Sequence, residues 1–500
     1  MAIELSNLKF TEQDDIVPPS GIKEILINMG IANTLAGDDL LKGDTGKNLS
    51  TPADRLSGIS NTGTLNTADG NDTIIGTGGS VSNTGNSFSG LYNSGTIHTD
   101  GGNDVIHGLR DQNGLGYGIY LEKGGTIDTG DGNDDIIGTT AENGPKGISI
   151  DSGSINTGNG DDLIRGRGTE GITVSSLGII DTGMGNDQIR GVGFFSNAIY
   201  NTGTIISGDG NDIINGNGRY YSGLANYSDG IFIGTINTGD GDDTIGGLAK
   251  NGITNGSDSI IDAGNGNDII TGSGTDPGSG DIGIRNDGTI NTGNGEDSII
   301  CSGKFVNAGE IFLGDDNDSL TAHMANRYWP GPRVFENFNF IGTGNGNDII
   351  TSAGFIYNEG VIDTGNGDDS IIVTQPVGSP PPFSRYGIYN NGGTIITGNG
   401  NYSIIANGGF ESGLNSSGSV FLGEGEDYLK GFGLGDFYGG NGNDILELTP
   451  GTYNVGRWGE TVTFSKGSSL MLATEFEQLI AGNTTYDFSN LTAGNTIVIA

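Results

Sequence analysis

The 500-residue sequence contains one cysteine, Cys301, so no disulfide framework can form within the chain. It also has only 12 prolines, 2 tryptophans and 3 histidines, and the histidines form no catalytic or metal-ligating constellation. Basic residues are scarce, because 21 Lys and Arg stand against 61 Asp and Glu, giving a net charge of −40. Such a charge repels phosphate backbones and anionic lipid surfaces, so nucleic acid and anionic membranes are not expected partners.

Long apolar runs are missing as well. No stretch of about 18 apolar residues occurs, so no membrane-spanning helix is expected. The first residues show no basic segment followed by an apolar one, so a cleaved export signal is not expected either. Only 33% of the residues are hydrophobic and 97 are glycine, a composition that indicates disorder when the glycines are aperiodic. Here they are periodic, which points to repeated corners instead.

A glycine-rich acidic turn recurs along the chain, as in TGDGNDDIIG at 129–138 and TGNGNDIITS at 343–352. We number each copy from its last acidic position, called zero, and a shorter copy ends on Asp39. In the fifteen clear copies position zero is Asp72, Asp104, Asp134, Asp162, Asp187, Asp212, Asp243, Asp268, Asp297, Asp318, Asp348, Asp369, Tyr402, Asp427 and Asp444. A repeat with this period indicates a solenoid.

The residues around each turn alternate as in a strand. Position +2 is Ile or Leu in every clear copy and position −7 is always apolar, whereas position +3 mixes apolar, polar and charged residues. A constant apolar column beside a variable one is the period-2 pattern of a strand with one buried face. Each unit therefore has one strand before the turn and one after it.

A third apolar stretch lies upstream and is followed by a recurring Asn at position −11. That Asn tolerates a corner and can bond to the same amide one coil away. It is Asn61, Asn93, Asn201, Asn286, Asn307, Asn337, Asn358 and Asn391. Three strands and three corners per unit predict an all-β fold, a right-handed parallel β-helix (β-solenoid) of about 16 coils and about 25 residues per coil, with terminal caps. The distance between successive turns varies from 17 to 33 residues. The variation falls after the strand that follows each turn, so insertions are expected at one corner.

The turns also predict multiple calcium sites along one edge. Glycine occupies position −2 in fourteen of fifteen copies, Asp316 being the exception, and glycines there and at −4 permit positive φ and inward carbonyls. Calcium takes six to eight oxygens, and a stack of carboxylates without cations repels itself. The predicted ligands are Asp72, Asp104, Asp134, Asp162, Asp187, Asp212, Asp243, Asp268, Asp297, Asp318, Asp348, Asp369, Asp427 and Asp444 with the carbonyls of Gly132, Gly210, Gly266 and Gly346. The alternative is a tight turn without metal, but Asn would serve there equally well and repel less.

The turn resembles the RTX, or hemolysin-type, calcium-binding repeat GGxGxDxUx, in which U is a large aliphatic residue. Residues 439–447, GGNGNDILE, match it fully, and the resemblance covers roughly residues 36–447. The family's standard coil is shorter and has two calcium corners, so the longer repeat here implies a three-sided helix with calcium along one edge. Tyr402 lacks the carboxylate. The resemblance implies type I secretion and an extracellular or cell-surface location.

The segments outside the repeat suggest a division into three parts. Residues 1–35 are expected to form an N-terminal cap or a strand that docks on a neighbouring molecule, residues 36–447 the β-helix, and residues 448–500 a β-rich cap with a secretion signal. Two inserts, 321–340 and 373–386, either cover the rod or bind a partner or sugar. Their candidate binding residues are Arg327, Tyr328, Trp329, Arg333, Phe383, Arg385 and Tyr386.

The expected function is structural: a secreted, calcium-stiffened rod that joins copies of itself head to tail into a filament, sheath or surface layer. A calcium-dependent adhesin or glycan-binding protein is the first alternative. A polysaccharide lyase or hydrolase is the second, and it is not favoured, because no carboxylate pair stands out from the acidic column. Ice binding by the threonines at position −5 is not favoured, because their parity with the Ile at −7 points them inward.

Overall fold

A computed structural model describes residues 2–19, 21–45, 57–79, 88–110, 116–122, 124–226, 234–275, 281–323, 333–374, 387–411 and 417–500. These residues form strands, with two short 3-10 helices, η1 (Leu5–Asn7) and η4 (Phe488–Asn490). No helix in the described ranges is long and apolar enough to cross a membrane. The chain divides into two compact units, Met1–Asn265 and Gly266–Ala500, and each is described by itself.

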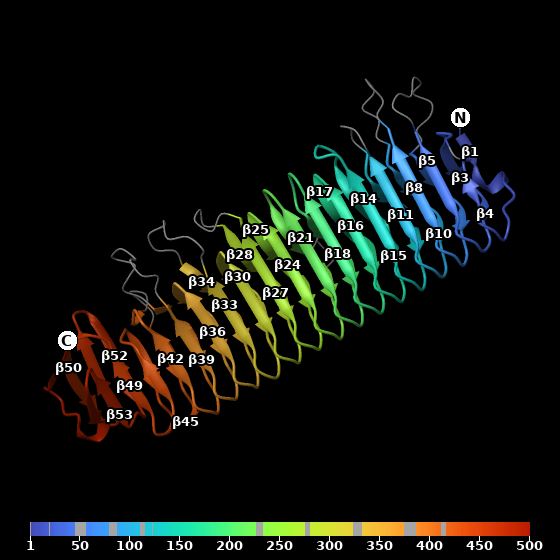
Figure 1. Cartoon of the computed structure of the whole chain (residues 1–500). Helices are drawn as coiled ribbons and strands as arrows, with labels where there is room; N and C mark the ends of the chain where they lie inside the picture. The colour runs from blue at the N-terminus through green and yellow to red at the C-terminus, as the bar shows by residue number, and fades with distance from the viewer. Residues whose placement is uncertain are drawn as a thin grey trace. The chain divides into compact units, whose positions relative to one another are not determined.

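In the first unit, the strands that follow the turns lie side by side as a parallel sheet, the turn-following sheet (Figure 1). Its register places the +2 residues opposite one another, so Ile106 pairs with Ile74 and Ile136. The strands are β5 (Leu40–Asp44), β8 (Thr73–Gly78), β11 (Val105–Arg110), β14 (Asp135–Thr140), β16 (Leu163–Gly168), β18 (Gln188–Gly193), β21 (Ile213–Gly218) and β24 (Thr244–Ala249).

The remaining two strands of each coil belong to a second parallel sheet, the turn-preceding sheet. Its upstream strands are β3 (Ile25–Asn28), β6 (Ile59–Asn61), β9 (Leu91–Asn93), β12 (Ile119–Leu121), β19 (Ile199–Asn201), β22 (Ser222–Asn226) and β25 (Asn251–Asn255). Those directly before the turn are β4 (Ile31–Asn33), β7 (Thr64–Asn66), β10 (Thr96–His98), β13 (Gly125–Asp128), β20 (Thr204–Ile206), β23 (Thr235–Asn237) and β26 (Ile260–Asp262).

The third side predicted for each coil is not a separate strand in every coil. β15 (Lys146–Asn156) and β17 (Glu170–Asp181) each run through both stretches as one strand. These coils carry Asp151 and Ser176 at position −11 instead of Asn. The loss of Asn does not by itself join the two stretches, because β12 and β13 stay separate although position −11 of their coil is Lys123. The predicted parallel β-solenoid is confirmed, with three stretches per coil arranged in two hydrogen-bonded sheets.

The second unit repeats this arrangement. Its turn-following strands are β27 (Ile269–Gly274), β30 (Ser298–Ser302), β33 (Ser319–His323), β36 (Ile349–Ala353), β39 (Ser370–Val373), β42 (Ser403–Ala406), β46 (Tyr428–Lys430) and β49 (Ile445–Leu448). Its upstream strands are β28 (Ile282–Asn286), β31 (Lys304–Asn307), β34 (Arg333–Asn337), β37 (Phe355–Asn358), β40 (Ile388–Asn390) and β43 (Phe410–Glu411). Its pre-turn strands are β29 (Thr289–Asn291), β32 (Glu310–Phe312), β35 (Phe340–Gly342), β38 (Val361–Asp363), β41 (Thr394–Ile396), β44 (Gly418–Phe421) and β47 (Gly435–Tyr438).

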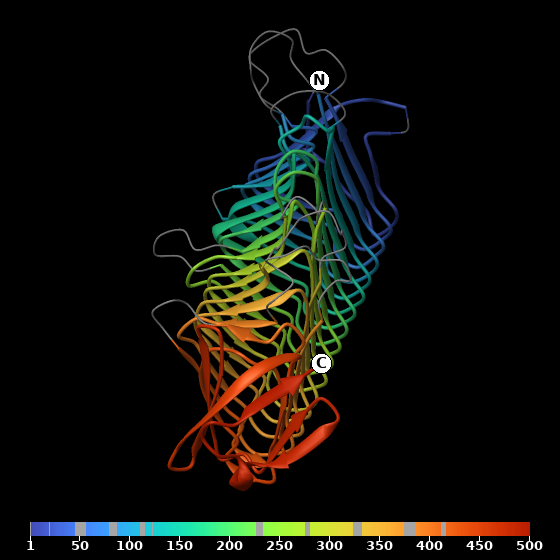
Figure 2. The same ribbon diagram turned by 90° about the vertical axis from the view of Figure 1, so that its left-hand side faces the viewer.

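Parallel pairing extends beyond residues 36–447 at both ends of the chain. In the first unit, β1 (Ala2–Glu4) pairs with β3 and β2 (Ile16–Val17) pairs with β5. In the second, β52 (Ser469–Thr474) pairs with β47 and β53 (Gln478–Ala481) with β49. The other C-terminal strands, β50 (Gly451–Trp458), β51 (Thr461–Lys466), β54 (Thr484–Asp487) and β55 (Thr496–Ile499), pair antiparallel, and in Figure 2 the red strands lie at the end of this unit. A short pair, β45 (Glu424–Gly425) and β48 (Asn441–Gly442), joins two turns.

The core includes the +2 and −7 columns and inward side chains of the upstream strands, such as Ile119 and Phe335, all of which are buried. A buried asparagine ladder accompanies them, in which each Nδ2 donates to Oδ1 of the next Asn at 2.8 to 3.0 Å. The prediction that Asn391 belongs to this ladder is wrong. Asn358 donates to Asn390 instead, because β40 places Asn390 opposite Asn358. The ladder also includes Asn28, which stands at −11 from Asp39 of the shorter copy, and Asn226 and Asn255, which do not stand at −11.

The prediction that extra residues leave from a single corner is also wrong. β22 ends at Asn226 and β23 begins at Thr235, whereas only two residues separate β19 from β20. A similar gap separates β43 from β44. Insertions therefore occur at the Asn corner as well, because a corner outside the two sheets has no register to maintain.

Candidate metal-binding turns

The turns have the backbone that their glycines predict. At positions −4 and −2 of one turn, Gly130 has φ +86° and Gly132 has φ +146°. The stack also leaves no room for a side chain, since a Cβ on Gly160 would lie 1.7 Å from the Gly132 carbonyl oxygen. Asp316 adopts φ +83° and so keeps the conformation without glycine. The other glycines predicted as ligands, Gly210, Gly266 and Gly346, have φ of +136°, +137° and +149°.

The carboxylates at position zero are buried and point toward the preceding coil. Oδ1 of Asp134, for example, accepts the amide N–H of Asp104 at 2.8 Å. In the first unit these bonds connect Asp15 through to Asp243, at 2.7 to 2.8 Å. In the second unit they run from Asp268 to Asp369 and from Tyr402 to Glu477, at 2.7 to 3.0 Å.

The second oxygen of most of these carboxylates has no hydrogen-bond donor. It is buried and accepts no hydrogen bond of good geometry in Asp39, Asp72, Asp104, Asp134, Asp162, Asp187, Asp212, Asp297, Asp318, Asp348, Asp369, Asp427 and Asp444. In several turns the threonine at position −5 lies beside the carboxyl but gives its single proton to a carbonyl of the next coil. The Thr99 hydroxyl, for instance, donates to the Thr129 carbonyl at 3.2 Å. A buried carboxylate oxygen without a donor is expensive unless a cation or a proton compensates it.

Burial perturbs the acidity of the column accordingly. It raises the pKa of Asp104, Asp187 and Asp369 to about 7, although the hydrogen bond from the neighbouring amide and the polar threonine hydroxyl beside the carboxyl act to lower it. The pKa of Asp318 rises to about 8, because the nearby Asp297, Asp348 and Asp316 charges add to burial. The carboxylates are thus held in an environment that favours the neutral acid, or an ionised acid with a cation beside it.

The residues at position −1 form a different, exposed ladder. Here the side chain accepts the amide of the next coil, so Asn103 Oδ1 takes the Asn133 N–H at 2.8 Å and Asn186 Oδ1 the Asn211 N–H at 3.0 Å. This ladder runs in the opposite direction to that of the buried aspartates. It explains why position −1 is Asn, Asp or Glu without any metal. The metal-free alternative therefore accounts for position −1, but it leaves the second oxygens at position zero uncompensated.

Tyr402 shows what occupies the turn where the carboxylate is missing. Its side chain is buried and its hydroxyl donates to the carbonyl of Gly365, at position −4 of the preceding turn, at 2.8 Å. It reaches back one coil, as the aspartates do. The turn thus has room for a positively polarised group next to an inward carbonyl oxygen, and the phenol fills it where no carboxylate is present. Carboxylate and carbonyl oxygens are the ligands that calcium prefers, so the other turns fit this ion.

Every predicted aspartate lies in the buried column, one per coil, and within the described ranges no three His, Cys, Asp or Glu side chains converge on one point. Two members of the column were missed: Asp15, which precedes β2, and Glu477, which accepts the Asp444 amide at 2.8 Å. Both lack the turn glycines, but each stands two residues before a buried apolar side chain, Val17 or Leu479. That spacing was the available signal.

The predicted partner-binding residues cannot be placed in the same way. Arg327, Tyr328, Trp329, Phe383, Arg385 and Tyr386 lie outside the described residues. Arg333 begins β34. Phe335, which the sequence places in the first insert, belongs to the core, where its ring centroid lies 4.7 Å from that of Phe305. The threonines at −5 are buried, as their parity predicts, so they form no exposed face.

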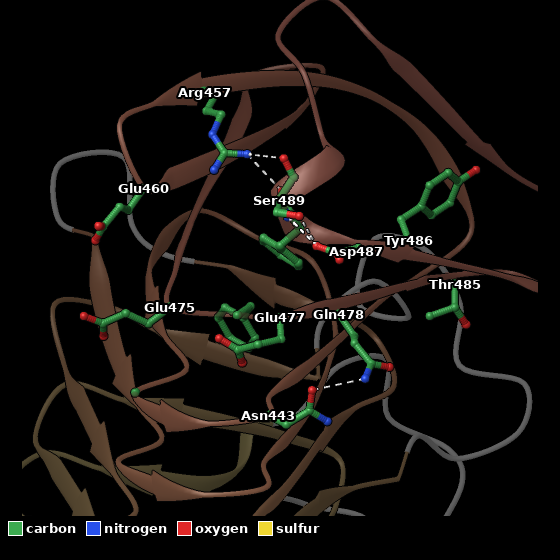
Figure 3. A pocket seen from close by; sticks show the side chains of 13 residues that line it. Asn443, Arg457, Glu460, Glu475, Glu477, Gln478, Thr485, Tyr486, Asp487 and Ser489 are labelled. Atoms are coloured by element: carbon green, nitrogen blue, oxygen red, sulfur yellow. Dashed lines mark hydrogen bonds between the residues drawn. The ribbon is translucent and has the colours of Figure 1, made fainter.

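A polar pocket of about 750 Å³ lies in the second unit (Figure 3). Its acidic lining residues are Glu460, Glu475, Glu477 and Asp487. Two of these acids have structural roles: Glu477 continues the carboxylate column, and Asp487 caps η4. The Arg457 guanidinium donates to the Phe488 carbonyl at 2.9 Å and so fixes the same 3-10 turn. The pocket thus belongs to the C-terminal packing, and these contacts assign it no reaction.

No protein-family model matches the sequence, and no curated protein matches it. A solved structure similar to this chain is the X-ray crystal structure of a hyperactive, Ca2+-dependent, beta-helical antifreeze protein from an Antarctic bacterium. The two are 18% identical, with a TM-score of 0.32, over 86% of this chain and 84% of that one. The stacked parallel sheets and the repeated turns of the described residues make this chain a β-solenoid repeat protein.

Proposed function

We propose that the protein is a calcium-bound structural solenoid. The observation that carries this proposal is the buried carboxylate column, in which, at turns such as those of Asp134 and Asp318, one oxygen accepts an amide and the other is buried without a hydrogen bond of good geometry. Calcium between successive turns would take that second oxygen together with inward carbonyls, and would neutralise a chain of net charge −40. The ligands would be the position-zero aspartates and turn carbonyls such as those of Gly132 and Gly346.

The resemblance of the turns to RTX repeats supports an extracellular setting for this role. Extracellular calcium is millimolar, which suits modules with dissociation constants of about 10⁻⁴ to 10⁻³ M. We propose that the chain leaves the cell by type I secretion and folds fully only where calcium is abundant. Metal binding would then contribute directly to the free energy of folding, because the unfolded chain has no preformed turns.

Self-association is the second part of the proposal. Among the described strands, β1 pairs only with β3 and β2 only with β5, so parallel edges at the start of the chain are free to add another strand. Copies joined head to tail through such an edge would form a filament, sheath or surface layer. We propose no catalytic role, and release of sugar products from a polysaccharide by the purified protein would contradict that part.

Chelation tests the calcium proposal directly. We expect EGTA to weaken the β-sheet circular dichroism and to expose more of the chain to protease, with both effects reversed by calcium but not by magnesium. Magnesium is the matched control, because it requires stricter octahedral geometry and dehydrates reluctantly. An unchanged spectrum in EGTA, or protein without bound calcium after gel filtration in millimolar calcium, would remove the proposal. Negative-stain micrographs of the same samples test assembly separately, since isolated particles in calcium would contradict it.

A further inference from the structure

Five basic side chains of the first unit lie on neighbouring coils without acidic partners. They are Arg165, Arg167, Arg190, Arg219 and Lys250, and all are exposed. Among the described residues no carboxylate forms an ion pair with any of them. In a chain with 61 acidic and 21 basic residues, unpaired positive charge gathered in one region is not explained by composition.

Two of these arginines oppose each other directly. β16 and β18 are neighbouring strands of the turn-following sheet (Figure 1), and their exposed residues Arg165 and Arg190 are partners in its parallel register. Parallel strands lie about 4.8 Å apart, and like charges in opposite positions destabilise a sheet. Their neighbours along the column, Ile137 and Asn215, carry no charge that would relieve the repulsion. An anion bound between them would relieve it.

Aromatic rings adjoin the arginines at the end of the same strands. The Arg167 guanidinium lies 4.9 Å from the ring centroid of Phe194. Phe195, which follows Phe194 after β18, stacks on Tyr220 of the next coil with centroids 6.0 Å apart and planes 9° from parallel, and Arg219 lies 5.3 Å from the Tyr220 centroid. The charged and aromatic groups are thus interleaved rather than segregated.

The rings are open to solvent. Phe195 is 43% exposed, Tyr220 46% and Tyr221 60%. Together with Lys250 and Asn251 they line a surface hollow of about 550 Å³. Exposed rings at the wall of a hollow present flat apolar faces to a ligand, and the adjacent Lys250 supplies positive charge.

We propose that this arginine–aromatic patch, which extends from Arg165 to Lys250 over the coils of β16, β18, β21 and β24, binds an acidic glycan. Guanidinium groups recognise carboxylate and sulfate through paired hydrogen bonds, and the flat faces of sugars fit exposed rings. Duplex nucleic acid carries one charge per about 1.7 Å, which the net −40 repels over long range more strongly than the sparser charge of a polyuronate, and an acidic peptide has no flat apolar face to stack. This binding goes beyond the proposed structural function and does not depend on it.

The test is calorimetric titration of the full-length protein, in millimolar calcium, with a short sulfated dextran and with a short oligogalacturonate. Neutral dextran and polyglutamate of matched length are the controls. We expect both acidic glycans to bind, and Arg165→Gln with Arg190→Gln to weaken binding by about tenfold or more, because each guanidinium makes charge-assisted contacts. Tyr220→Ala should also weaken it. Lys42→Gln should not, although Lys42 is exposed on β5 in the same outward column.

Circular dichroism and thermal unfolding of each variant establish that it folds as the natural protein does. The proposal is overturned if neither acidic glycan binds, or if Lys42→Gln weakens binding as much as the arginine pair does. Polyglutamate binding equal to that of sulfated dextran would also overturn it in favour of an acidic protein partner. Unchanged affinity in a folded Tyr220→Ala variant would show that sugar stacking is not involved.

Discussion

Replacing Tyr402 with Asp should add one calcium ion to the protein. The natural hydroxyl donates to the Gly365 carbonyl at 2.8 Å. An aspartate would instead accept the Asp369 amide with Oδ1, as Asp369 accepts the Asp348 amide at 2.8 Å, and would leave Oδ2 and the Gly365 carbonyl for the ion. The backbone is already suited to the change, because the Tyr402 amide donates to Asp427 Oδ1 at 2.8 Å as in other turns. Since each carboxylate reaches back only one coil, the substitution creates one site, between the turns of Asp369 and residue 402.

The expected magnitude has two opposing parts. Without calcium, removal of a buried ring leaves a cavity, and large-to-small core substitutions of aromatic residues cost about 3–5 kcal/mol. The new carboxyl is then buried without a cation, which adds to the loss. With calcium at a hundred times the dissociation constant, one additional site stabilises the fold by about 2.7 kcal/mol. The variant should therefore be less stable than the natural protein in EGTA and recover much of that loss in calcium.

The assay is bound calcium per chain after gel filtration, measured by elemental analysis, with thermal unfolding in calcium and in EGTA. Tyr402→Phe is the matched control, because it removes the bond to Gly365 without supplying a ligand. It should bind the same number of ions as the natural protein and lose about 1 kcal/mol. A folded Tyr402→Asp variant with no additional calcium would refute this assignment of the site, even if the natural protein binds calcium elsewhere.

Two further predictions concern pH and the asparagine ladder. Burial raises the pKa of Asp72 to about 6, of Asp104 to about 7 and of Asp318 to about 8, so the calcium-free folded state binds more protons than the unfolded chain, and its free energy of unfolding should fall as pH rises from about 4 to 7. Calcium requires the ionised form, so the trend should reverse with calcium present; melting temperatures at pH 5 and pH 8 that fall alike in both conditions would contradict this. Asn307→Ala should cost about 3 kcal/mol in chemical denaturation, because Asn307 donates to Asn337 and Phe340 at 2.9 Å within the core. Exposed Asn483→Ala should cost almost nothing, and equal losses would count against the ladder.

Much of the fold could be predicted because the repeat reports the same interaction many times. The alternation of Ile74 with the variable column gives strand direction and burial, and repetition fixes the parallel stacking. The repeat pattern did not identify the coils at the two ends. Asp15 and Glu477 complete the carboxylate column without turn glycines, so a pattern that required glycine could not include them.

The candidate site was predictable only in part. The spacing identified the aspartates, and the glycines gave the positive φ values, because both are local properties of one turn. The spacing could not show that Oδ1 of Asp134 accepts the amide of a neighbouring turn while its second oxygen is buried without a hydrogen bond. The spacing also could not identify Asn390 in place of Asn391. Both residues are asparagine, and a shift of one residue at the corner decides which of them pairs with Asn358.

The sequence by itself determined the architecture: a solenoid with one buried acidic turn per coil, because hydrophobic periodicity and turn chemistry are written residue by residue along the chain. Only the tertiary structure decided how the coils meet. It made Tyr402 a substitute for a ligand by placing its hydroxyl on Gly365 of the preceding coil. It likewise brought Arg165 opposite Arg190, which lie 25 residues apart in sequence, and joined Phe195 to Tyr220. These contacts depend on the stacking register between coils, which strand pairing sets and local sequence does not.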